Sequence, residues 1–279
     1  MTTMSTRFPQ FTVRAPEPIE VGPDAIPALI VRPEAEEPRP AALVQHGYGA
    51  SKADLLPLGQ FLASYGFVAL LPDAWGHGDR FPTSGPNWMS DFSADFIVEV
   101  LRHTVDDMGI ALTTLLDRAD VQPGGALLAG FSLGAIAALI VGTEDARTAG
   151  IYSISGSPVP DLVQMMPAGM PGPGPDAERW ARAHDSAAHL ATLAPKPLLL
   201  QHGRNDDMVP VAGSVRLYET AQSLYGAHPD RLALMLYDHR HDVTEAEVAE
   251  GVEWLLPFFA DTAESAERGG HGESGEPAA

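Results

Sequence analysis

One serine interrupts an otherwise apolar stretch and is flanked by glycines. Residues 126–142 read ALLAGFSLGAIAALIVG, and the segment GFSLG places a glycine two positions before and two positions after Ser132. An apolar strand pattern gives way to an apolar helical pattern at this point, where a sharp turn holds a serine in strained backbone angles with its hydroxyl exposed. The glycines suit a turn that leaves no room for a Cβ atom. A tight turn with an incidental serine is the alternative.

A serine hydroxyl is a weak nucleophile at neutral pH, so nucleophilic chemistry at Ser132 requires a base and a group that orients the base. The later segment LLLQHGRNDDMVP offers Asp206 and Asp207 as the orienting acid, and LYDHRHDVTEAEV offers His239 and His241 as the base. From the spacing alone, either aspartate could serve. Nucleophile, acid and histidine therefore follow one another in the order Ser, Asp, His.

His239 and His241 could also do different chemistry. Histidines two positions apart on a strand point to the same side and could ligate a metal ion. No third ligand has a clear spacing, so we expect no metal site, and we expect His239 to be structural or solvent-facing.

The elements that must position these residues alternate between strands and helices, which predicts an α/β fold with a mostly parallel sheet covered on both faces. The expected strands are 27–33, 41–47, 67–74, 126–132, 150–157, 197–203 and 232–238. The expected helices are 54–65, 91–118, 133–142, 213–226 and 244–260. Each candidate residue follows the carboxyl end of an expected strand, and those ends share one crevice in an open sheet.

Two segments depart from this alternation. Residues 158–175 are too rich in proline and glycine for a regular helix, and with the helix-like segment that follows they make a candidate lid or cap at 158–190 whose Met165 and Met166 could line an apolar pocket. Residues 261–279 are small, acidic and glycine-rich, which predicts a disordered tail. We therefore expect one domain over 1–260.

Composition restricts the class of partner. The 17 basic and 37 acidic residues leave a formal charge of −20, which disfavours binding to nucleic acids and to membrane surfaces. There is no cysteine, so no disulfide or thiolate site can form. The N-terminal residues do not resemble a signal peptide, and no apolar run reaches the length of a membrane span, so we expect a soluble, cytoplasmic protein. The oligomeric state, monomer or homodimer, stays open.

Taken together, these motifs resemble the α/β-hydrolase family from about residue 28 to residue 260. The segment QHGYGASKADLLPLGQFLASYGFVALLPDAWGHGDR looks like the bacterial serine esterases and acyl-peptidase relatives of the dienelactone-hydrolase type. The resemblance implies the α/β-hydrolase fold: a mostly parallel central sheet of about eight strands, helices on both faces and a short lid-like insertion. The family pattern G-x-x-D-x-x-V-P selects Asp206 over Asp207, and the step HDVT into the last helix selects His241.

The resemblance also implies an oxyanion hole. The backbone N–H groups of Tyr48, in the segment HGYG, and of Leu133, after the serine, are the family-consistent donors to a tetrahedral oxyanion. We then expect His46 to support its loop by hydrogen bonding, the alternative being a role as a base, which His241 already fills. Trp75 and His77, after the next strand, are candidate pocket residues.

Within the same loop, an ion pair between Asp73 and Arg80 is expected to stabilise the chain.

The function that these features predict is hydrolysis of carboxylic esters of small or medium acyl substrates through an acyl-enzyme on Ser132, with no cofactor. A peptidase or acyl-peptide hydrolase and a thioesterase would use the same residues. A haloalkane or epoxide hydrolase would need aspartate at position 132. A hydrolase fold that has no catalytic activity and binds a small ligand or a protein is the alternative from another class.

Overall fold

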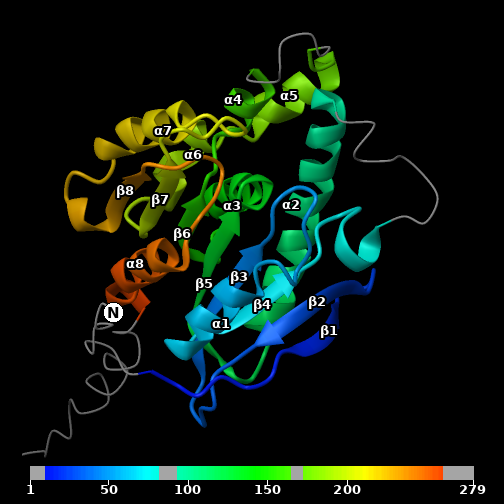
Figure 1. The fold of residues 1–279 in the computed structure, drawn as a ribbon, viewed down its shortest axis with the longest axis vertical. Coiled ribbons are helices and arrows are strands. Elements are labelled where there is room, and N and C mark those ends of the chain that lie inside the picture. The colour runs from blue at the N-terminus through cyan, green and yellow to red at the C-terminus, as the bar shows by residue number, and fades with distance from the viewer. Residues whose placement is uncertain (1–9, 82–92, 165–171, 260–279) are drawn as a thin grey trace, which may run out of the picture.

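One eight-stranded sheet organises the protein, and the computed structural model describes residues 10–81, 93–164 and 172–259 (Figure 1). The strands lie in the order β1-β2-β4-β3-β5-β6-β7-β8. β1 and β2 form an antiparallel hairpin, β2 pairs antiparallel with β4, and all the other pairs are parallel. Their bounds are β1 Glu17–Val21, β2 Ile26–Val31, β3 Arg39–Gln45, β4 Val68–Pro72, β5 Val121–Phe131, β6 Thr148–Ile154, β7 Leu198–Gly203 and β8 Leu232–Tyr237.

Helices cover both faces of the sheet. Helices α1 and α8 pack on one face, whereas α2, α3, α6 and α7 pack on the other (Figure 1). Successive residues of the central strands point to opposite faces of the sheet and pack into the hydrophobic core on each face. Leu128 of β5 therefore faces α2 and α3, while Leu127 faces α1 and α8. The helices are α1 Leu56–Ser64, α2 Ala94–Leu116, α3 Leu133–Glu144, α4 Val159–Gln164, α5 Pro175–Ala183, α6 Ser186–Leu193, α7 Ala212–Gln222 and α8 Glu245–Leu255, with 3₁₀ turns η1 Gly78–Arg80 and η2 Pro229–Arg231.

The predicted α/β architecture is confirmed, and every expected strand has a counterpart in the sheet. The strand β1 was not predicted, because EPIEV carries two glutamates and is mostly exposed along the edge of the sheet. The expectation that residues 158–175 contain no regular helix is wrong for α4. Proline is tolerated in the first turn of a helix, where its missing N–H needs no partner, and Pro160 is the second residue of α4.

The candidate lid or cap at 158–190 lies in the segment between β6 and β7, which carries α4, α5 and α6. Helix α5 lies beside the N-terminal half of α2 (Figure 1). Gly174 N–H donates to Asp95 at 2.8 Å, and Arg102 pairs with Asp176 at 3.1 Å. Met165 and Met166 lie outside the described residues, as does the expected tail at 261–279. Among the helices of the described ranges, none combines the length and apolar character needed to cross a membrane.

Two glycines allow three backbone segments to meet at the end of β5. A Cβ atom on Gly130 would lie closer than 3.0 Å to the Gly134 carbonyl group, and one on Gly134 would lie closer than 3.0 Å to the carbonyl oxygens of Gln45 and His46. Backbone atoms cannot move aside as a flexible side chain can. The glycine spacing in GFSLG is therefore a packing requirement between β5, α3 and the end of β3.

We predict that Gly134→Ala lowers the free energy of unfolding by about 1–3 kcal/mol, the usual cost of forcing an extra carbon into a closely packed site. Gly109→Ala is the matched control, because Gly109 lies inside α2 and a Cβ atom there meets nothing within 4 Å. Alanine favours a helix over glycine, so this control should be unchanged or stabilised by up to about 1 kcal/mol. Urea unfolding measures both, and equal midpoints for the two variants would contradict the packing requirement.

Candidate active site

Ser132 sits on a strained turn between β5 and α3. Its φ of 55° and ψ of −121° lie in a region that a residue with a Cβ atom rarely adopts. The turn is held on both sides, because Ser132 N–H donates to the Ile154 carbonyl at 2.8 Å and Ile136 N–H donates to the Ser132 carbonyl at 3.0 Å. The side chain is left half-buried at the end of the sheet. Such a turn presents Oγ to a neighbouring base rather than to the helix.

His241 reaches the serine from the loop between β8 and α8. Its Nε2 lies 3.0 Å from Ser132 Oγ, and its Nδ1 lies 2.7 Å from Asp206 Oδ2. An ionised carboxylate only accepts, so the ring proton is on Nδ1 and Nε2 is free to accept from the serine hydroxyl. The loop ends at a capping box, in which Thr244 and Glu247 hydrogen-bond each other's backbone N–H.

Asp206 is buried but well supplied with donors. Its Oδ1 accepts the N–H groups of Met208 and Val209, both at 2.9 Å. Burial alone would raise the pKa of this carboxyl, but hydrogen bonds from His202, His241 and the Val209 N–H outweigh burial and hold the pKa well below its usual value. The carboxylate is therefore ionised and fixed in position.

The hydrogen bond that His202 donates to Asp206 was not anticipated from the sequence. His202 Nε2 lies 3.2 Å from Asp206 Oδ2 and 2.7 Å from the Val209 carbonyl oxygen, and both are acceptors, so Nε2 carries a proton. The ring is buried, and Nδ1 lies 2.8 Å from Ser214 Oγ at the start of α7. The available signal was a histidine at the end of an apolar strand, four positions before the aspartate.

Asp207 and His239, the alternatives that spacing left open, do not take part in the hydrogen bonds between Ser132, His241 and Asp206. Asp207 is exposed and forms an ion pair with Arg240. His239 points toward α8, where its Nε2 lies 3.1 Å from Glu247 Oε2, and its Nδ1 lies 2.9 Å from the Arg240 carbonyl oxygen. No group of three or more His, Cys, Asp or Glu side chains that could hold a metal ion gathers in the described ranges.

The loop after β3 adjoins the serine from the other side. A Cβ atom on Gly47 would lie 3.3 Å from Ser132 Cβ and 3.3 Å from the Phe131 carbonyl oxygen, so the Gly47–Tyr48 peptide is packed against the turn. Leu133 is the first residue of α3, and the N–H groups of a first helical turn have no partner within the helix. These are the positions of the two backbone donors expected for an oxyanion hole.

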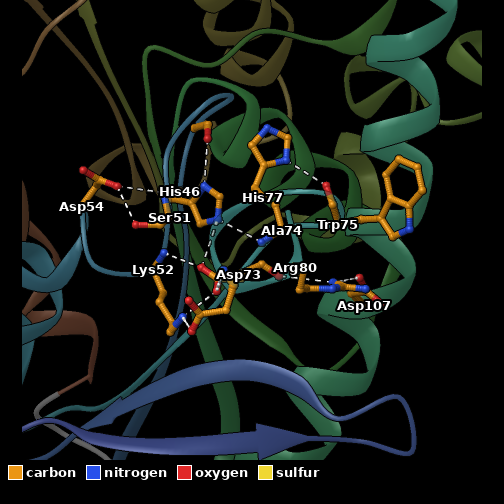
Figure 2. Close-up of polar contacts among 12 residues, drawn as sticks. His46, Ser51, Lys52, Asp54, Asp73, Ala74, Trp75, His77, Arg80 and Asp107 are labelled. Carbon is orange, nitrogen blue, oxygen red and sulfur yellow. Dashed lines mark hydrogen bonds and ion pairs between the residues drawn. The ribbon is translucent and has the colours of Figure 1, made fainter. Parts of the chain in front are cut away.

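The candidate pocket residues after β4 lie next to this loop (Figure 2). His77 is buried, its ring meets the Tyr48 ring edge-on at 5.1 Å, and its Nδ1 lies 2.8 Å from the Trp75 carbonyl oxygen. Burial lowers the pKa of His77. The Trp75 ring is stacked on His103 of α2 at 4.5 Å, so it packs on that helix.

The expected ion pair between Asp73 and Arg80 does not form. Arg80 pairs with Asp107 of α2 instead and reaches only the main-chain carbonyl of Asp73, at 3.3 Å (Figure 2). The Asp73 carboxylate is turned away into the loop, where it binds Lys52 Nζ at 2.5 Å. A buried carboxylate needs an opposite charge and several donors, and Lys52 Nζ together with the N–H groups of Lys52 and Asp79 supplies them to Asp73.

A family model described as the alpha/beta hydrolase family matches residues 42–273. The chain belongs to the alpha/beta hydrolase family, as its motifs suggested.

Its sequence is 28% identical over 250 residues to a protein named "Putative esterase YitV" from Bacillus subtilis (strain 168), covering 84% of this chain and 96% of the relative. It is also 28% identical over 251 residues to "Esterase YjfP" from Escherichia coli (strain K12), covering 84% and 94%.

Solved structures agree on the fold. TT1662 from Thermus thermophilus has a TM-score of 0.72 and 27% identity and covers 89% of this chain and 98% of its own. A putative dienelactone hydrolase from Klebsiella pneumoniae has a TM-score of 0.64 at 15% identity, covering 89% and 99%, a likeness that shows the fold alone.

We predict that His202→Leu lowers the free energy of unfolding by about 2 kcal/mol, because it removes a donor from a buried carboxylate. In the control His202→Gln, the side-chain amide can place a nitrogen donor where Nε2 stands, so the loss should be less than half as large. Urea unfolding of the two variants beside the wild type measures the difference. Equal losses would mean that the ring fills space but does not serve Asp206.

Proposed function

We propose that the protein is a serine hydrolase that cleaves carboxylic esters of small or medium acyl substrates. The observation that carries the proposal is the chain of hydrogen-bonding distances from Ser132 Oγ to His241 Nε2, 3.0 Å, and from His241 Nδ1 to Asp206 Oδ2, 2.7 Å. This is the geometry of an activated nucleophile with an oriented base. The esterase names of two relatives at 28% identity favour an ester as the substrate.

In the proposed acylation, Ser132 Oγ attacks the ester carbonyl carbon while its proton passes to His241 Nε2. The carbonyl oxygen becomes an oxyanion that accepts the N–H groups of Tyr48 and Leu133. When this intermediate collapses, the bond to the alcohol oxygen breaks and His241 returns the proton to the departing alcohol. Asp206 holds the ring in the Nδ1–H tautomer and stabilises the transient imidazolium.

Deacylation repeats these steps with water. His241 Nε2 takes a proton from a water molecule, the resulting hydroxide attacks the acyl carbon, and Ser132 Oγ leaves with the proton from His241 as the acid is released. No cofactor takes part in the proposed reaction. The residues proposed to border the substrate are Trp75, Met165, Met166 and His77, which lies beside the Tyr48 ring. The proposed partner is a small-molecule ester, not a nucleic acid or a membrane.

We predict that a fluorophosphonate probe labels the wild type and that labelling disappears in Ser132→Ala. The esterase kcat should fall on the order of a million-fold, because the nucleophile is lost. Ser223→Ala is the control: Ser223 follows α7, its hydroxyl reaches only the Thr220 carbonyl at 3.5 Å, and it should keep full labelling. A folded wild type that takes up no probe would favour the binding-protein alternative.

The bond type is tested on the same preparations. Hydrolysis of p-nitrophenyl esters from acetate to laurate would measure the acyl range, and preference for a thioester or an acyl-peptide over every ester in the series would replace the ester assignment.

The two neighbouring aspartates make a second matched test. Asp206→Asn should lower kcat by about 10⁴-fold, because an amide cannot hold His241 in the required tautomer. Asp207→Asn should leave kcat within about twofold, since Asp207 is exposed and pairs with Arg240. Steady-state kinetics on p-nitrophenyl acetate would distinguish them, and a large loss in Asp207→Asn would invalidate the assignment of Asp206.

A further inference from the structure

His46 lies at the end of β3 with both ring nitrogens bonded to the main chain. The ring is completely buried. Nε2 accepts the Ala74 N–H at 2.9 Å, and Nδ1 lies 2.8 Å from the Gly47 carbonyl oxygen (Figure 2). A backbone N–H can only donate, so Nε2 carries no proton, and the neutral ring has its proton on Nδ1. Burial lowers the pKa of His46, which favours this neutral form.

The acceptor of the Nδ1 proton belongs to a particular peptide group. The Gly47 carbonyl and the Tyr48 N–H are the two ends of one planar peptide unit, so fixing the carbonyl fixes the direction of the N–H. A hydrogen bond accepted by the carbonyl also polarises the unit and strengthens its N–H as a donor. The same unit is packed against Ser132, since a Cβ atom on Gly47 would lie 3.3 Å from Ser132 Cβ.

The Ala74 N–H, which donates to His46 Nε2, is held in place by the buried carboxylate of the preceding residue, Asp73. The Asp73 side chain is completely buried and accepts the Lys52 N–H at 2.8 Å, Lys52 Nζ at 2.5 Å and the Asp79 N–H at 2.9 Å (Figure 2). Asp73 N–H donates to the Pro27 carbonyl at 2.8 Å. The loop after β4 thus presents the Ala74 N–H to His46 from a fixed position.

We propose that His46 is a positioning residue of the oxyanion hole: by donating Nδ1–H to the Gly47 carbonyl, it aims and polarises the Tyr48 N–H toward the developing oxyanion. This inference rests on the proposed function, since it needs an oxyanion on Ser132. His46 transfers no proton in this proposal, because its ring is buried and both nitrogens are occupied by main-chain groups. The Ala74 N–H sets the tautomer of His46, and the tautomer determines that a donor faces the Gly47 carbonyl.

Two substitutions separate the two hydrogen bonds of the ring. In His46→Asn the amide nitrogen takes the position of Nδ1 and can donate to the Gly47 carbonyl, while the acceptor for Ala74 N–H is lost. In His46→Gln the amide oxygen takes the position of Nε2 and can accept from Ala74, while the donor to Gly47 is lost. Each variant loses one buried hydrogen bond, so we expect similar melting temperatures.

We expect His46→Gln to lower kcat for p-nitrophenyl acetate about 10- to 100-fold with little change in KM, since one oxyanion donor is misaligned but not removed. Affinity for a trifluoromethyl ketone, which forms an oxyanion on the serine, should fall in parallel. His46→Asn should keep a kcat at least about tenfold above that of the glutamine variant. A purely structural role would lower both variants alike.

Equal losses of kcat in the two variants, the reverse order, or an effect confined to KM would overturn the positioning role. If a variant does not fold, the tautomer of His46 is measured in the wild type. Long-range ¹⁵N–¹H spectra of the histidine rings should then show a protonated Nδ1 and an unprotonated Nε2 for His46. The opposite tautomer overturns the inference. A wild type without esterase activity overturns the proposed function as well, whereas an active wild type whose two variants behave alike overturns the inference alone.

Discussion

The close approach of three backbone segments at the end of β5 is the constraint on which the site depends. Gly130 and Gly134 have no room for a Cβ atom, so β5, α3 and the end of β3 lie against one another without intervening side chains. This contact forces the chain to turn within a single residue, and Ser132 adopts a positive φ as a result. The same contact sets the Gly47–Tyr48 peptide beside the serine. The proposed nucleophile and the proposed oxyanion donor are thus positioned by one packing arrangement.

The electrostatic problem of the site is to keep one carboxylate ionised inside the protein. Taking Asp206 out of water favours its neutral form, but donors approach from three sides: the Met208 and Val209 amides, His202 and His241. These donors outweigh burial, so the pKa of Asp206 lies below its usual value and the charged form is favoured. A charge held by fixed donors costs little to reorganise, which is what an orienting acid in the proposed mechanism requires.

The parts of this arrangement that could be predicted from the sequence are those governed by local pattern. Continuous apolar runs identified the central strands, and the GFSLG spacing identified the turn at Ser132, because both depend on neighbours in the chain. The edge strand β1 and helix α4 were not anticipated, since each has a composition that contradicts its structure. The pairing of Arg80 with Asp107 joins distant segments, and nothing in their local sequence distinguishes it from the alternative pairing. His202 lies only four positions before Asp206, but its hydrogen bond depends on how the loop after β7 folds back on the strand.

Two histidines of this site show how neighbours, and not residue type, assign chemistry. His241 has a carboxylate on Nδ1 and a hydroxyl on Nε2, so its ring can take a proton from one side while being stabilised from the other. His46 has a main-chain acceptor on Nδ1 and a main-chain donor on Nε2, so neither nitrogen has a partner with which to exchange a proton. Both rings have the Nδ1–H tautomer, yet the contacts of His241 would allow it to exchange a proton, whereas those of His46 keep its proton on Nδ1. In the proposed mechanism the two rings have complementary roles, because the oxyanion formed with the help of His241 would be met by the Tyr48 N–H that His46 is proposed to position.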